Sequence, residues 1–160
     1  MALLKEVSEY RSNIMKMLCS DEDIVKLVSD NKSLTVPDKS LIYKNIYPYA
    51  YVPDTNTDAK TFICFCFNFG NIYDKTYKKG YLTFYVFSNQ KILRTSDGLR
   101  CDLIAERIEE LFNGNYDIGL GRMQLSSVDD ISPINDYHGV SIQYAFSDFN
   151  RPTIGRDWHK

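Results

Sequence analysis

Near the start of the chain, hydrophobic positions recur every three or four residues. This spacing predicts an amphipathic helix over residues 3–18. The positions that form its apolar stripe are Leu3, Leu4, Val7, Tyr10, Ile14, Met17 and Leu18. A second short helix is predicted over about residues 22–29. Ser20, which is followed by three acidic residues, is the expected N-cap of this second helix.

In the middle of the chain, the hydrophobic pattern changes from the three-to-four-residue spacing of a helix to the two-residue period of a β-strand. Residues 61–69 carry apolar side chains on both faces, which predicts a central strand covered on two sides. Residues 81–87 predict a second strand. The two strands form a hairpin with an unusually long polar connection from Gly70 to Gly80. Before the hairpin, the aromatic residues 46–51 predict an extended segment, suited to a sheet edge where Pro48 is tolerated.

The second half of the chain predicts one helix and two strands. The helix has Ser96 or Asp97 as its expected N-cap and Gly114 just beyond its end. Its apolar stripe consists of Leu99, Leu103, Ile104, Ile108, Leu111 and Phe112. Two closing strands follow at about 120–128 and 139–147.

The order of these elements is α-α-β-β-α-β-β, which favours an α+β fold. We expect an antiparallel or mixed β-sheet of about four strands with flanking helices. A length of 160 residues suits one domain, here over residues 1–150, followed by a C-terminal tail at 151–160.

Charge and hydropathy narrow the classes of function. The net charge of -2 lacks the basic excess that nucleic-acid binders usually carry. Lys79-Gly80-Tyr81 matches an RNA-recognition strand for three positions and then departs from it, so a small single-stranded nucleic-acid-binding module is a less favoured alternative. No apolar run is long enough for a membrane helix, and the first residues do not resemble a signal peptide. We therefore expect assembly in the cytoplasm.

The residues that could carry chemistry are isolated in the sequence. Neither His138 nor His159 has an evident partner. Cys64 and Cys66 share one strand face, but no second Cys or His pair completes a metal site. The four cysteines are expected to be free, buried thiols. We expect no enzymatic activity, no metal and no cofactor.

The long hairpin is the best candidate for a binding surface. Its basic and aromatic residues are Tyr73, Lys75, Tyr77, Lys78 and Lys79. Tyrosine is enriched at interfaces because it adds contact area with few rotamers to restrict. A polar loop over 129–136 carries the acids Asp129, Asp130 and Asp136. Patches of opposite charge at two places on one chain suit a head-to-tail contact within a ring.

The ordered set of segments resembles the tail terminator (tail completion) proteins of tailed bacteriophages. The resemblance covers most of residues 20–149 and is one of pattern and order. The segments that carry it are residues 23–28, Tyr47-Pro48 with the strand at 61–69, the helix at 99–108, residues 118–122, and the strand 139–144 with Asp148-Phe149.

This resemblance implies a structural virion protein without a cofactor. It implies a homo-oligomeric ring, a hexamer in that family, with the tail tube protein and the head-side connector protein as partners. It implies neither a membrane nor sequence-specific nucleic acid as a partner. The aromatic segment 41–53 and the tail with Trp158 fit the family less well. They leave open another neck component, a head-closure or adaptor protein.

Overall fold

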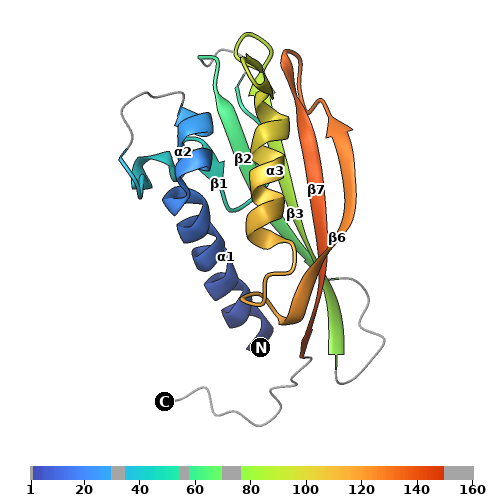
Figure 1. The fold of residues 1–160 in the computed structure, drawn as a ribbon. Helices are drawn as coiled ribbons and strands as arrows, with labels where there is room; N and C mark the ends of the chain where they lie inside the picture. Colours follow the sequence, from blue (N-terminus) through green and yellow to red (C-terminus); the bar gives the residue numbers. More distant parts are fainter. Residues whose placement is uncertain (1, 30–34, 55–57, 70–76, 150–160) are drawn as a thin grey trace.

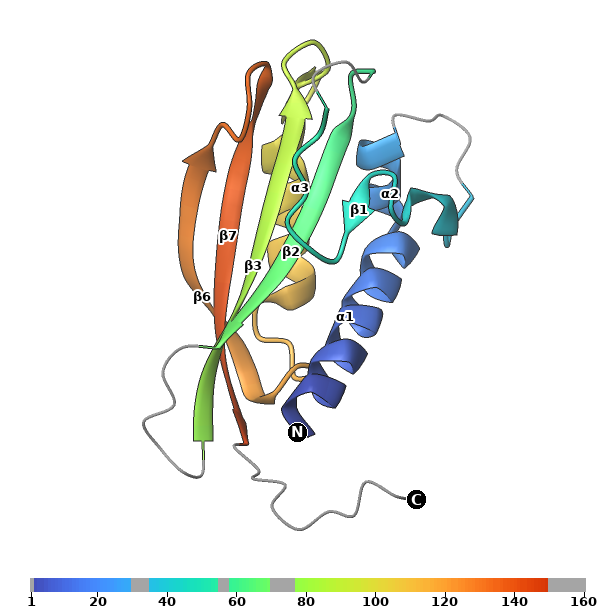
Figure 2. The same cartoon turned by 180° about the vertical axis from the view of Figure 1, so that it is seen from behind.

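The computed structural model of the chain describes residues 2–29, 35–54, 58–69 and 77–149. Within these residues, three α-helices pack on one face of a β-sheet, as Figure 1 shows. They are α1 (Ala2–Ser20), α2 (Glu22–Ser29) and α3 (Arg100–Phe112). The opposite face of the sheet is seen in Figure 2, where the segment after β1 crosses in front of β2 and β3.

The described residues form a five-stranded sheet in the order β1-β2-β3-β7-β6. The strands are β1 (Ile46–Tyr47), β2 (Thr61–Phe69), β3 (Tyr77–Asn89), β6 (Leu120–Ile131) and β7 (Tyr137–Phe149). β1 runs parallel to β2, and the other neighbours are antiparallel. A one-turn 3-10 helix η1 (Lys39–Leu41) and a small hairpin, β4 (Arg94–Thr95) with β5 (Gly98–Leu99), complete the elements.

The predicted α+β class is confirmed. The two opening helices, the hairpin, the third helix and the closing strands occur in the expected order. The extended aromatic segment provides the edge strand β1, which makes the sheet mixed.

The main core lies between the helices and the sheet. Ile14, Leu18 and Ile24 from the first two helices meet the inward face of the sheet. Alternation along β2, β3 and β7 supplies that face, since every second residue points towards the helices. Its fully buried members include Phe65, Leu82, Phe84, Val86, Ile142 and Tyr144.

A smaller aromatic core lies on the opposite face. Tyr51 stacks on Tyr47, with ring centroids 4.0 Å apart and planes 5° apart. Both rings contact Phe62, whose own ring lies against Phe87. This cluster holds the segment after β1 against the sheet (Figure 2).

Both predicted helix caps are wrong. Asp21 caps α2 in place of Ser20, because its Oδ1 accepts the Ile24 backbone N–H at 3.1 Å while Ser20 still belongs to α1. α3 begins after Leu99, which makes no side-chain cap bond. Ser96 and Asp97 instead occupy the turn between β4 and β5.

Candidate interaction surfaces

The basic hairpin divides into a strand and a part outside the described residues. Tyr73 and Lys75 lie outside them. The sequence pattern predicts that Tyr77, Lys78 and Lys79 lie in the tip of the hairpin. In the structure they form the first residues of β3 and pair with β7. Tyr77 is half exposed, and Lys79 is exposed.

Lys78 points inward and is not a surface residue. Its side chain is 1% exposed, and its Nζ lies 3.7 Å from Oδ2 of Asp148. The same carboxylate accepts a hydrogen bond from the Tyr10 hydroxyl at 3.2 Å. The prediction that Lys78 belongs to a binding surface is therefore corrected, because its charge is matched inside the fold.

Lys79 and Tyr81 form the basic element that does reach the surface. They lie on the outer face of β3, since their positions alternate with the buried Gly80 and Leu82. The Lys79 Nζ lies 5.3 Å from the Tyr81 ring centroid, within cation–π range. The ammonium group of Lys79 and the ring of Tyr81 are therefore both available to a partner on the outer face of β3.

The three predicted acids are all exposed, and two of them lie on a strand instead of a loop. Asp129 and Asp130 belong to β6 and project towards opposite faces of the sheet edge. Asp136 lies in the turn between β6 and β7 with φ of 69°. Its Oδ1 accepts a hydrogen bond from Nε2 of Gln90 at 3.0 Å.

The basic and acidic elements lie far apart within one molecule. Tyr77 pairs with Phe149 at one end of the β3–β7 ladder, and Asn89 pairs with Tyr137 at the other. The ladder has 13 residues in each strand, so its ends are about 40 Å apart at 3.3 Å per residue. Asp136 lies beside the Asn89–Tyr137 end, whereas Asp129, which pairs with Ser141, lies six positions, or about 20 Å, from the level of Lys79. A contact between Lys79 and Asp136 therefore requires two copies.

An acidic ridge on α3 is a feature that the sequence reasoning missed. Asp102, Glu106, Glu109 and Glu110 are exposed along the outer side of this helix. Their spacing of four, three and one residues places them on one helical face. The same spacing argument that located the apolar stripe would have found this ridge.

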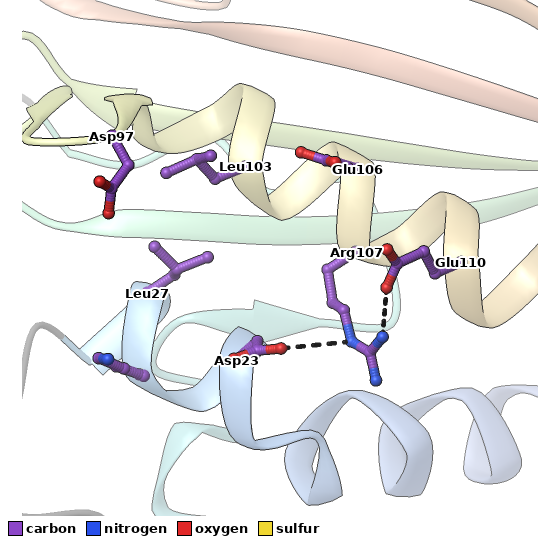
Figure 3. Close-up of a pocket in the computed structure, with 8 residues that line it drawn as sticks. Asp23, Leu27, Asp97, Leu103, Glu106, Arg107 and Glu110 are labelled. Atoms are coloured by element: carbon purple, nitrogen blue, oxygen red, sulfur yellow. Dashed lines mark hydrogen bonds and ion pairs between the residues drawn. The ribbon is translucent and has the colours of Figure 1, made fainter.

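A pocket of about 290 Å³ lies between α2 and α3, on one side of this ridge (Figure 3). Leu27 and Leu103 line it together with the charged residues Asp23, Lys26, Asp97, Glu106, Arg107 and Glu110. Arg107 reaches across it from α3 and pairs with Asp23 and Glu110, as the dashed lines in Figure 3 show.

Asp21 also ties α2 to α3 through Arg107. Its carboxylate accepts hydrogen bonds from Nε and Nη2 of Arg107, at 3.0 and 2.7 Å. Burial raises the pKa of Asp21, but the bonds from Arg107 and from the Ile24 backbone outweigh it and hold the pKa below its ordinary value. The ion pair between Asp21 and Arg107 therefore joins α2 to α3.

A second groove, of about 210 Å³, lies on the other side of the ridge, between α3 and β6. Its floor is apolar and consists of Ala105, Leu125, Val128 and Ile142. Glu106 and Glu109 form its rim on the helix side. Leu125 and Val128 face the helix layer, yet they are 40% and 55% exposed because α3 does not extend over β6 (Figure 1).

Among the residues weighed for catalysis, the Cys101 thiol donates to the backbone carbonyl of His138 at 3.5 Å, and His159 lies outside the described residues. Nδ1 of His138 lies 2.9 Å from the Ser132 hydroxyl at an exposed position, and the described residues place no acid in contact with the ring. All four cysteines are free. Burial raises the pKa of Cys64 and of Cys101 to about 12, so both thiols stay protonated at neutral pH. In the part of the chain that the structure describes, no group of three or more His, Cys, Asp or Glu side chains could hold a metal ion.

None of the described helices is long and apolar enough to cross a membrane. A search of curated proteins finds no match to the chain. The model of the YomW family matches residues 21–146, from the residue that caps α2 to near the end of β7. This match covers α2, α3 and most of the length of the long strands. The chain therefore belongs to YomW, a phage-derived family of the SPBeta-like prophage type.

Proposed function

We propose that this chain is a structural protein of the phage neck, a tail terminator that forms a ring between the tail tube and the head-side connector. The observation that carries the proposal is the separation of Lys79 and Tyr77, at one end of the β3–β7 ladder, from Asp136, at the other end. A molecule with complementary patches at opposite ends associates head to tail. Such an assembly forms a closed ring when the rotation between successive copies adds up to a full turn.

Three further observations support this function. The YomW family is phage-derived. The order of elements agrees with the resemblance to tail terminators described above. The raised pKa values of Cys64 and Tyr10 are caused chiefly by burial, as is usual for side chains packed in a core. The protein is proposed to act by contact alone, without turnover or cofactor, and to reside in the virion.

The first experiment measures assembly of the purified chain. Light scattering after size-exclusion chromatography, together with negative-stain microscopy, should show closed rings whose formation weakens as salt rises. Asp129→Lys should reduce ring formation, whereas Glu22→Lys, the matched change on an exposed part of α2, should not. A strict monomer at high concentration, both alone and with the tail tube protein, would contradict the proposal.

The second experiment separates the terminator from the other neck components. A phage that lacks this gene should make tails of uncontrolled length, since nothing stops tube growth. Tails of normal length that fail to join filled heads would instead point to a head-closure or adaptor protein.

A single-stranded nucleic-acid-binding module is the second candidate. One observation favours it: Tyr81 and Tyr85 lie four residues apart on the outer face of β3, with Lys79 over the Tyr81 ring. Stacking on such rings is how proteins hold single strands without reading their sequence. This candidate predicts salt-sensitive oligonucleotide binding that Tyr81→Ala abolishes, and unchanged assembly in the same variant.

A further inference from the structure

The groove between α3 and β6 has the composition of a binding site for a basic, apolar chain segment. Leu125 and Val128 offer apolar surface at its floor, and Glu106 and Glu109 offer charge at its rim. Apolar contact with matching charge at the edge is the usual composition of a peptide-binding groove.

The backbone of β6 adds a second means of binding. β6 is the last strand of the sheet order and pairs with β7 along one side only, among the described residues. A long, unpaired edge can accept a strand from another chain through main-chain hydrogen bonds. The free edge and the exposed Val128 therefore lie next to each other on one element.

The residues that follow β7 match this surface in charge and in pattern. Segment 150–160 carries Arg151, Arg156 and Lys160 against the single acid Asp157, which gives a net charge of three minus one, or +2. In an extended chain, Ile154, Arg156 and Trp158 share one face because alternate residues point the same way. Two apolar side chains and a cation would thus face an apolar floor with an acidic rim.

β7 ends at Phe149, at a distance from the groove of its own molecule. Leu125 and Val128 pair with Tyr144 and Ile142, which precede the end of β7 at Phe149. A chain that continues beyond Phe149 in the direction of the strand moves away from those positions. Phe149 itself pairs with Tyr77, at the basic end of the molecule.

We propose that segment 150–160 of one copy docks along β6 and the α3–β6 groove of the neighbouring copy. The eleven residues span about 36 Å when extended. The contact continues the proposed meeting of the basic end of one copy with Asp129 and Asp130 on β6 of the next. It therefore rests on the proposed ring and identifies the surface through which the ring closes.

Trp158 is the single tryptophan of the chain, so its intrinsic fluorescence reports the docking directly. In the full chain, its emission should shift to shorter wavelength as concentration rises and assembly proceeds. A blue-shifted emission that does not depend on concentration would mean docking on the same molecule and would overturn the proposal.

Substitutions at exposed positions test the groove without disturbing the core. Val128→Asp should raise the concentration at half-assembly by about tenfold or more and should keep Trp158 in water. Val52→Asp is the matched control, since Val52 is 64% exposed on the opposite face and should leave both readouts unchanged. Circular dichroism establishes that both variants fold.

A charge exchange tests the pairing of segment and rim. Glu109→Lys and Arg156→Glu should each weaken assembly, and the two changes together should restore much of it. Rings that form normally in Val128→Asp, with an unchanged Trp158 emission, would overturn the docking and leave the ring proposal standing. A full chain that is monomeric at all concentrations, with Trp158 emission typical of water, would contradict both.

Discussion

Lys78 and Asp148 face one another across β3 and β7, with 3.7 Å between Nζ and Oδ2 and with both side chains buried. Burial of a charge is costly unless a partner compensates it, so removal of one partner is worse than removal of both.

Lys78→Met should lower the free energy of unfolding by about 3–5 kcal/mol, because it removes the ammonium group beside the buried carboxylate of Asp148. Lys78→Met combined with Asp148→Asn should recover most of this loss, since the amide oxygen still accepts the Tyr10 hydroxyl. Urea denaturation at pH 7 measures both. If the free energy of unfolding of Lys78→Met lies within about 0.5 kcal/mol of that of the parent chain, the Lys78–Asp148 pair does not stabilise the fold.

Asp21 should make the stability of the chain fall in acid. A carboxyl whose folded pKa is lowered contributes stability that is present above its ordinary pKa, near 4, and lost as pH falls through the folded value. Asp21→Asn should therefore lower the denaturation midpoint at pH 7 and have little effect at pH 2. Asp23→Asn, an exposed neighbour with a 3.8 Å contact to Arg107, should change the midpoint far less at either pH.

Gly119 and Gly121 flank the start of β6 and offer a matched pair of substitutions. Both have positive φ, +70° and +74°, so alanine at either costs about 1–2 kcal/mol in backbone strain. A Cβ at Gly119 would also lie 2.4 Å from the Ser147 carbonyl oxygen, whereas one at Gly121 meets nothing within 4 Å. Thermal unfolding should show a clearly larger loss for Gly119→Ala, and equal losses would contradict the packing at this point.

The four thiols should differ in reactivity in the folded chain. Cys66 is only partly buried, whereas Cys19, Cys64 and Cys101 are buried. Reaction with Ellman's reagent at pH 8 should give one faster thiol, which Cys66→Ser removes and Cys64→Ser does not. All four should react at once in denaturant, and four equal rates in the native state would contradict the burial.

The raised thiol pKa values also predict a loss of stability in alkali. Burial raises the pKa of Cys64 and of Cys101 from an ordinary value of 9.0 to about 12. The neutral form is favoured in the folded chain, so the stability it contributes is complete below pH 9 and is lost as pH rises towards 12. Cys64→Ala should flatten this decline over pH 9–12 in denaturation experiments, and an unchanged slope would contradict it.

The helices and the long strands can be predicted from the local pattern of hydrophobic residues. The errors in the predicted helix caps arise where one short stretch of sequence fits both a cap and a turn. Ser96-Asp97-Gly98 is both a cap signal and a turn signal, and the turn between β4 and β5 uses it. α3 then begins at Arg100, whose guanidinium donates to the carbonyls of Ile92 and Leu27. Leu27 is 73 residues away in the sequence, so the sequence alone cannot identify it as a partner of Arg100.

The candidate surfaces could be predicted only in part. The alternation of β3 places Lys78 on the same face as Leu82, Phe84 and Val86, but only the register with Asp148 shows how its charge is accommodated. The acidic face of α3 was readable from its spacing. The α3–β6 groove was not, because its two walls are brought together by the pairing of β6 with β7.

The β3–β7 ladder also bears on how the molecule would carry force. The basic end leads into the first residue of β3, and the acidic turn leads into the first residue of β7, at the opposite end of the same antiparallel pair. A pull between these ends acts along both strands in opposite directions, while their hydrogen bonds lie across the strands. Every bond of the ladder is then loaded in shear at once, instead of one after another. The molecule should be stiffest along the line that joins its two charged ends.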